Sequence, residues 1–151
     1  MASRTSGGKR AGGRILAIDY GRRRLGLALS DELGLLARPL ATLERSNRRS
    51  DLEKLSRIAA ENAVALVVVG LPLRLDGTAS EMAEEARAFA LKLARAAGVG
   101  VELVDERLTS WEAEESIPGG KSAAAKRRGA IDQRAAVLIL EEYLRRGPIE
   151  A

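Results

Sequence analysis

Three acidic side chains, Asp19, Glu106 and Asp132, stand where their positions could support chemistry. Asp19 ends a short apolar run rich in β-formers, and Glu106 follows another such run. Asp132 lies near the start of a segment with helical apolar spacing. Clustered carboxylates repel one another unless hard cations hold them, and oxygen ligands suit Mg²⁺ or Mn²⁺. Two such ions can clamp the attacking and leaving oxygens of a phosphoryl displacement, with water as the nucleophile. The three acids together therefore predict a two-metal phosphodiesterase site.

Each acid also has a structural explanation when it is considered alone. Asp132 at a helix start could compensate the helix dipole, and Glu106 could pair with the neighbouring Arg107. Asp19 is harder to explain in this way, because it interrupts an apolar run and a buried acid is costly without a partner. Asp105 is ambiguous, because successive strand residues point to opposite faces and only one of Asp105 and Glu106 can face such a site.

The composition of the 151 residues excludes several classes of mechanism. The chain contains no cysteine and no histidine, so disulfides, thiolate metal sites, His-ligated zinc and Ser-His-Asp or Cys-His catalysis are all excluded. No apolar run approaches the length of about 20 residues that spans a bilayer. A signal peptide is not expected, because no apolar core precedes Ile15. These features predict a cytoplasmic protein with no membrane partner.

The apolar patterns predict an α/β chain with a mixed sheet flanked by helices. Three hairpin-linked antiparallel strands come first, and two parallel strands alternate with helices after them. The strands are expected at about 15–19, 25–30, 35–40, 64–70 and 99–104. The first helix is expected to end at about residue 62, with an N-cap at either Ser46-Asn47 or Ser50-Asp51, and the others at about 80–97, 109–115 and from 127–130 onward. Residues 1–13 are expected to form a disordered basic arm, residues 14–147 one domain and residues 148–151 a tail.

This order of elements explains how the acids could meet. Sites in open α/β sheets form outside the carboxyl ends of the strands, so Asp19 and Glu106 are expected at the same sheet edge. The start of the last helix, packed on that face, would deliver Asp132. A Pro-Gly-Gly loop within residues 117–122 precedes this helix and is expected to be mobile.

Basic residues accompany the predicted site in two groups, and they are candidates for binding phosphates. The groups are Arg22, Arg23 and Arg24 in the first hairpin turn, and Lys121, Lys126, Arg127 and Arg128 around the start of the last helix. Solvated charged faces would explain the same residues. Aromatic side chains are few, which favours structured or duplex-like nucleic acid over a stacked single strand. Trp111 could stack on a base or pack under the mobile loop.

Four stretches of the sequence, in register, resemble the YqgF/RuvX family of RNase H-like nucleases. They are Ala-Ile-Asp-Tyr-Gly with Gly-Leu-Ala-Leu-Ser-Asp (17–31), Val-Val-Gly-Leu-Pro with Asp-Gly (68–77), Val-Asp-Glu-Arg-Leu-Thr (104–109) and Ile-Asp-Gln-Arg-Ala-Ala (131–136). The resemblance implies an RNase H-like fold, with Asp19, Glu106 and Asp132 as metal-binding catalytic acids. It also implies maturation of the small-subunit ribosomal RNA precursor, or cleavage of Holliday junctions.

These observations predict a Mg²⁺- or Mn²⁺-dependent endonuclease for structured nucleic acid, acting in 5′-end maturation of pre-16S rRNA. A Holliday junction resolvase acting on branched DNA is the nearest alternative, and it would need a homodimer with two active sites. A non-catalytic RNA-binding assembly factor is an alternative of another class. A two-domain ATPase of the actin or sugar-kinase type shares the opening hairpin, but 151 residues leave room for one domain only.

Overall fold

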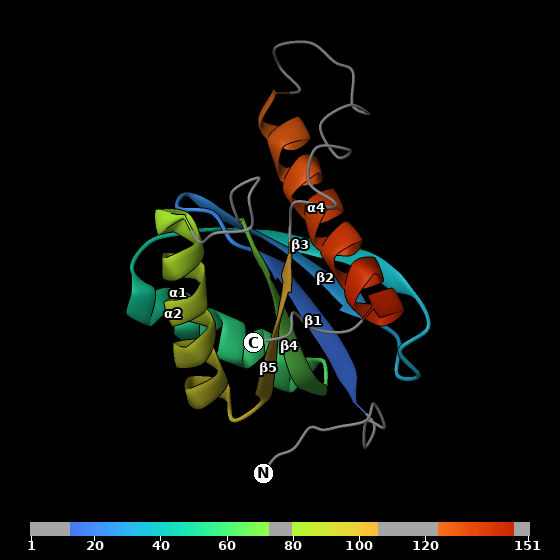
Figure 1. Ribbon diagram of the computed structural model, residues 1–151. Helices are drawn as coiled ribbons and strands as arrows, with labels where there is room; N and C mark the ends of the chain where they lie inside the picture. The colour runs from blue at the N-terminus through green and yellow to red at the C-terminus, as the bar shows by residue number, and fades with distance from the viewer. Residues whose placement is uncertain (1–12, 73–79, 106–123, 147–151) are drawn as a thin grey trace.

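A single five-stranded sheet forms the centre of the protein in the computed structural model, which describes residues 13–72, 80–105 and 124–146 (Figure 1). The strand order is β3-β2-β1-β4-β5. Their bounds are β1 (Arg14–Asp19), β2 (Arg24–Ser30), β3 (Ala37–Glu44), β4 (Val64–Leu71) and β5 (Gly100–Asp105). Strands β1, β2 and β3 pair antiparallel, while β4 lies parallel to β1 and to β5. The predicted mixed sheet is therefore confirmed.

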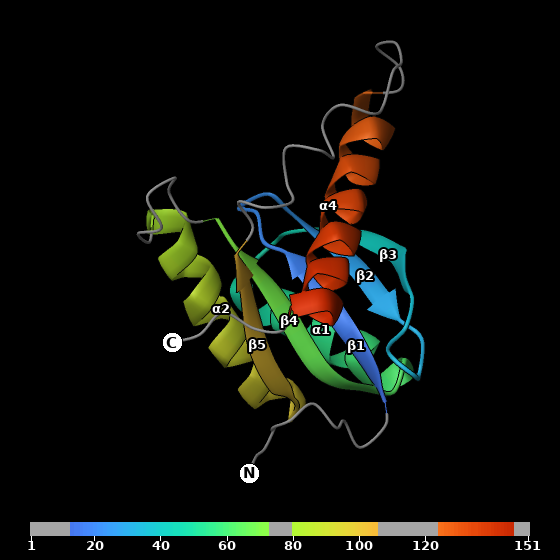
Figure 2. The ribbon, with the colours of Figure 1, turned by 45° about the vertical axis from the view of Figure 1, so that its right-hand side comes forward.

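Helices cover both faces of this sheet (Figures 1 and 2). Helices α1 (Arg48–Glu61) and α2 (Glu81–Ala97) pack on one face, and α4 (Ala124–Arg146) packs on the other. The Asn47 side chain caps α1 by accepting from the Ser50 amide, and the Ser80 side chain caps α2 by accepting from the Ala83 amide. Gly98 ends α2 in the left-handed region at φ 70°. The bounds of α2 agree with the predicted ones, and of the two N-caps predicted for the first helix the structure uses Asn47.

The residues of β1 alternate between two hydrophobic cores. Leu16 and Ile18 pack with the apolar faces of α1 and α2, whereas Ile15 and Ala17 pack with α4. All four side chains are fully buried. Because side chains alternate along a strand, Asp19 continues the second set and lies on the face that α4 covers.

The third strand begins and ends later than the predicted 35–40. The reason is a tight turn in which the Asp31 carboxylate accepts hydrogen bonds from the Leu35 and Leu36 amides, at 2.7 and 3.2 Å. These bonds hold the leucines in the turn, so β3 starts after them. Pro39 does lie in an edge strand, as its missing N–H predicted.

Helix α4 begins earlier than the predicted 127–130, because alanine, lysine and arginine are strong helix formers and fill its first turns. Asp132 consequently lies in the third turn and not the first. The dipole explanation for Asp132 is therefore wrong, since that effect is confined to the first turn.

The predicted helix at 109–115 with Trp111, the loop at 117–122, most of the basic arm and the tail lie outside the described residues. Within the part of the chain that is described, no helix combines the length and apolar character needed to cross a membrane.

Candidate active site

Asp19 lies at the carboxyl end of β1, between two glycines of the neighbouring strands. Its register partner in β2 is Gly26, and its register partner in β4 is Gly70. Neither neighbour carries a side chain. Side chains from α4 can therefore approach Asp19 on this face without meeting a side chain of either neighbouring strand residue.

At Gly26 the backbone of α4 comes very close to the sheet. A Cβ atom at Gly26 would lie 2.0 Å from the Asp132 carbonyl oxygen and 2.9 Å from the Asp132 Cβ. Cross-strand neighbours have Cβ positions about 4.5–5.5 Å apart, so the Cβ atoms of Asp19 and Asp132 lie within roughly 8 Å of each other. The structure thus brings Asp19 and Asp132 together, as the topology predicted.

Thr42 of β3 holds the same turn of α4 from the side. Its hydroxyl donates to the Gly129 carbonyl at 2.8 Å and accepts from the side-chain amide of Gln133 at 3.0 Å. Nothing in the residues around Thr42 predicts this contact. Because Asp132 lies between these two helix positions, the two hydrogen bonds of Thr42 fix where Asp132 lies relative to the strands.

Arg24, the first residue of β2, forms an ion pair with Asp132. The distance from Arg24 Nε to Asp132 Oδ2 is 2.8 Å, with 24% and 18% of the two side chains exposed. The carboxylate of Asp132 is therefore largely shielded from water and carries a positive partner from the predicted basic turn.

Arg22, two residues earlier, points to a different element. It donates from Nε and Nη2 to the two carboxylate oxygens of Glu85 in α2, at 3.0 and 2.5 Å, and Glu81 lies 3.8 Å away. The hydrogen bond from Arg22 lowers the pKa of Glu85 below its ordinary value. Arg23 is exposed. The three arginines predicted as one phosphate-binding group thus have three different surroundings.

Behind Asp19, a second arginine–aspartate pair supports the chain that leaves β1. Arg45 donates to Asp51 at 3.0 Å and to the Gly21 carbonyl at 3.0 Å. Its guanidinium lies 4.9 Å from the ring centre of Tyr20 and 5.0 Å from that of Phe89. These contacts fix Tyr20 and Gly21, which directly follow Asp19.

Comparison with known proteins identifies the family. The chain matches RuvX, described as Holliday junction resolvase, over residues 13–146. The chain belongs to the RuvX family. A relative from Koribacter versatilis (strain Ellin345), named "Putative pre-16S rRNA nuclease", is 46% identical over 138 residues, which is 91% of this chain and 90% of that protein. A relative of the same name from Synechococcus elongatus is 43% identical over 129 residues, covering 85% of this chain and 87% of that protein.

The fold is also shared with a solved structure. The RuvC of T. thermophilus in complex with Holliday junction substrate has a TM-score of 0.57 and 17% sequence identity, covering 91% of this chain and 99% of that one. The predicted RNase H-like fold of this RuvX-family chain is thereby confirmed.

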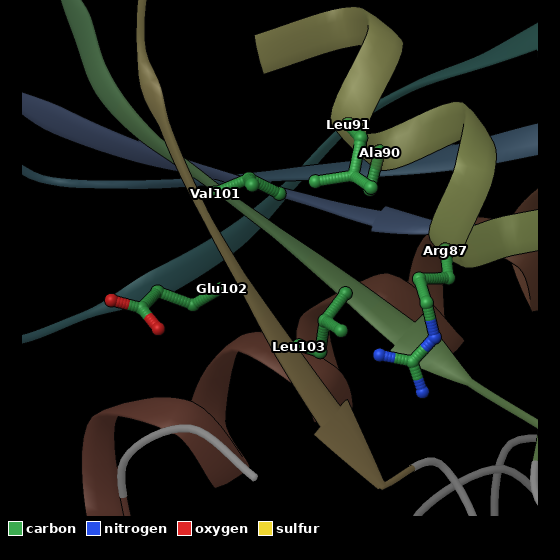
Figure 3. Close-up of a pocket in the computed structure, with 6 residues that line it drawn as sticks. All are labelled: Arg87, Ala90, Leu91, Val101, Glu102 and Leu103. Atoms are coloured by element: carbon green, nitrogen blue, oxygen red, sulfur yellow. The ribbon is translucent and has the colours of Figure 1, made fainter. Parts of the chain in front are cut away.

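The side chains of β5 alternate between the α2 face and the α4 face of the sheet. Figure 3 shows Glu102 on the side of β5 away from α2, and Val101 directed toward Leu91 of α2. A pocket lies between α2 and β5 (Figure 3). Neither Asp19 nor Asp132 lines it. By the same alternation Asp105 belongs to the α2 side, whereas Val104 packs in the α4 core.

The remaining predicted site residues lie outside the described part of the structure. Glu106 and Lys121 fall in a segment that is not described, and Lys126, Arg127 and Arg128 belong to the first turns of α4, where only the helix is described.

Of the three predicted metal ligands, the structure describes two, Asp19 and Asp132, and both would bind a cation through carboxylate oxygens. Among those residues no group of three or more His, Cys, Asp or Glu could hold a metal ion, and the third predicted ligand is not one of them. Carboxylates alone, shielded and adjacent, fit Mg²⁺ or Mn²⁺ and do not fit a soft metal.

Proposed function

We propose that this RuvX-family chain is a metal-dependent endonuclease that hydrolyses phosphodiester bonds in structured nucleic acid. The supporting observation is the packing of Asp132 on Gly26, the register partner of Asp19. Two carboxylates that are far apart in the sequence share one partly shielded position at the carboxyl edge of the sheet. Such a position repels anionic substrates unless divalent cations are bound.

Asp19, Asp132 and Glu106 would hold the cations. Bound Mg²⁺ or Mn²⁺, as two ions in the proposed mechanism, would supply Lewis acidity and make water a better nucleophile. The chain itself contributes orientation. Thr42 and Gly26 set the position of Asp132, and the Arg45 network fixes the residues that follow Asp19.

Basic residues are proposed to hold the substrate backbone. Arg23 is exposed in the segment between β1 and β2, and Lys121, Lys126, Arg127 and Arg128 belong to the segment that leads to Asp132. Phosphate contacts of this kind position a substrate without reading its sequence.

The proposed substrate is precursor 16S ribosomal RNA, cut during 5′-end maturation in the cytoplasm. Its support is the name shared by relatives that are 46% and 43% identical over most of this chain. The second candidate is branched DNA, which the description of the family favours. That activity would require a homodimer, because a junction is cut on two strands.

The test is cleavage of precursor 16S rRNA and of a synthetic four-way junction by the purified protein with Mn²⁺. We expect metal-dependent cleavage of the RNA, and a loss of about 100-fold or more in Asp19→Asn and in Asp132→Asn. Asp105→Asn is the matched control, because this acid belongs to the other face of β5, and it should retain activity.

Preference for the junction would select the resolvase. Binding of RNA without cleavage of either substrate would leave the assembly-factor alternative and contradict the nuclease proposal. Full activity in Asp19→Asn would show that the site is elsewhere.

A further inference from the structure

The ion pair between Arg24 and Asp132 places a cationic side chain on a predicted metal ligand. We infer that Arg24 is an internal counter-ion, which neutralises Asp132 in the metal-free protein and gives up its carboxylate when a divalent cation binds. This inference rests on the proposed metal site. In this inference Arg24 controls the affinity for the metal, whereas the sequence predicted that it binds phosphate.

The need for a counter-ion follows from the position of the carboxylates. Asp19 and Asp132 lie on the same face, joined through Gly26, and only 18% of the Asp132 side chain is exposed. Two like charges with little water between them repel strongly. Arg24 Nε, at 2.8 Å from Asp132 Oδ2, offsets this repulsion.

The geometry of the bond favours exchange. Arg24 contacts Asp132 through Nε, whereas Arg22 grips Glu85 with both Nε and Nη2. A bidentate fork is the stronger arrangement for an arginine and a carboxylate. Arg24 also keeps 24% of its side chain exposed, so the guanidinium can turn toward solvent without being buried and unpaired.

A competitor for a ligand lowers the apparent affinity for the metal. Arg24 and the cation both require negative charge on Asp132, so each weakens the binding of the other by the same factor. Removal of Arg24 therefore has two opposite consequences. The metal-free protein loses stability, and the affinity for the metal rises. A purely structural arginine would lower both.

The experiment measures Mn²⁺ binding by the electron paramagnetic resonance signal of free Mn²⁺, together with the thermal midpoint of the metal-free protein. Arg24→Gln should bind Mn²⁺ about tenfold more tightly than the parent, within the usual range of coupling between two sites. Its metal-free midpoint should fall. Arg22→Gln is the matched control, because it removes the same charge from the same turn but belongs to Glu85. Its Mn²⁺ affinity should change by less than about threefold.

Two further variants keep the test decisive. In Arg24→Gln combined with Asp132→Asn, the gain in affinity should disappear. If Arg24→Gln does not fold, Arg24→Met, which removes the charge but keeps a long unbranched side chain, should fold and bind Mn²⁺ more tightly than the parent.

Unchanged or weaker Mn²⁺ binding in a folded Arg24 variant, with normal binding by the parent, would overturn the counter-ion role alone. An equal gain in Arg22→Gln would also overturn it, by showing a general charge effect. Absence of Mn²⁺ binding by the parent would overturn the proposed metal site and this inference with it.

Discussion

Two arginine–aspartate pairs lie on opposite faces of the same end of the sheet, and they differ in how completely each is enclosed. In the inner pair, Arg45 and Asp51 keep 13% and 1% of their side chains exposed. In the outer pair, Arg24 and Asp132 keep 24% and 18%. Both pairs use the arginine Nε, at 3.0 and 2.8 Å.

The surroundings of the two pairs differ more than their distances. Asp51 also accepts from the Ser46 amide at 3.1 Å, and Arg45 donates to the Gly21 carbonyl and lies over two aromatic rings. Asp132 instead packs against Gly26, the register partner of Asp19. The additional hydrogen bonds and ring contacts make the inner pair part of the structure, whereas the more exposed outer pair can exchange its partner.

The largest expected effect is the difference in stability between two aspartate-to-alanine variants, one from each pair. Asp51→Ala leaves the Arg45 charge enclosed without its partner and should lower the free energy of unfolding by about 3–5 kcal/mol. Asp132→Ala should lower it by less than about 1 kcal/mol, because Arg24 can reach solvent and one repelling carboxylate is lost. Urea denaturation of both metal-free variants measures the difference. Equal losses would remove the distinction between the pairs.

Gly26→Ala should disturb the outer pair and leave the inner one intact. The added methyl meets the Asp132 backbone, so α4 must move, at a cost of about 1–3 kcal/mol. Mn²⁺ binding should fall together with stability. Gly100→Ala is the control, because its added Cβ would lie 3.4 Å from a Leu66 methyl, close to ordinary contact. A Gly26→Ala protein with normal Mn²⁺ affinity would show that the position of α4 does not determine the site.

Thr42→Val tests how firmly α4 holds Asp132 in the outer pair. The variant keeps the shape of the side chain but removes the hydroxyl that bonds Gly129 and Gln133. We expect a loss of about 1 kcal/mol in the free energy of unfolding and a weaker metal affinity. Thr42→Ser should restore both quantities in calorimetric titration, since it keeps the hydroxyl. Failure of serine to restore them would assign the effect to packing.

Asp31 offers a third carboxylate, held by backbone amides and not by an arginine, and it should show the smallest effect. Hydrogen bonds from the Leu36 and Leu35 amides lower the pKa of Asp31 below its ordinary value. A lowered pKa stabilises the folded protein above the unfolded pKa of about 4, and this contribution disappears as the pH falls through the folded value.

Asp31→Asn should therefore be slightly less stable than the parent at pH 7, and the gap should close below about pH 4. Thermal midpoints measured across this range give the comparison. A gap that does not change with pH would mean that the carboxylate charge is not what the turn uses.

Most of the fold could be predicted because its causes are local. Apolar alternation and runs predict the strands, and the caps at Asn47, Ser80 and Gly98 end their helices through local backbone and side-chain chemistry. The third strand was misplaced because the hydrogen bonds of Asp31 override the apolar character of the leucines beside it.

The site was predictable only in part. Asp19 was recognisable because it interrupts an apolar strand. Gly26 lies inside β2, where the absence of a side chain makes room for α4. A glycine within a strand pattern often marks such a close approach. The partners of Arg24 and Thr42 come from a helix about a hundred residues away, and nothing in the local sequence specifies them.

That separation has a consequence for the time at which the protein becomes complete. Arg24 and Asp132 are 108 positions apart in the chain. At about 5–20 residues per second, a ribosome needs roughly 5–20 s to go from one to the other. During this interval the strands can pair while the face that α4 covers is still open and Asp132 is missing. The proposed site therefore stays incomplete in a growing chain until α4 docks.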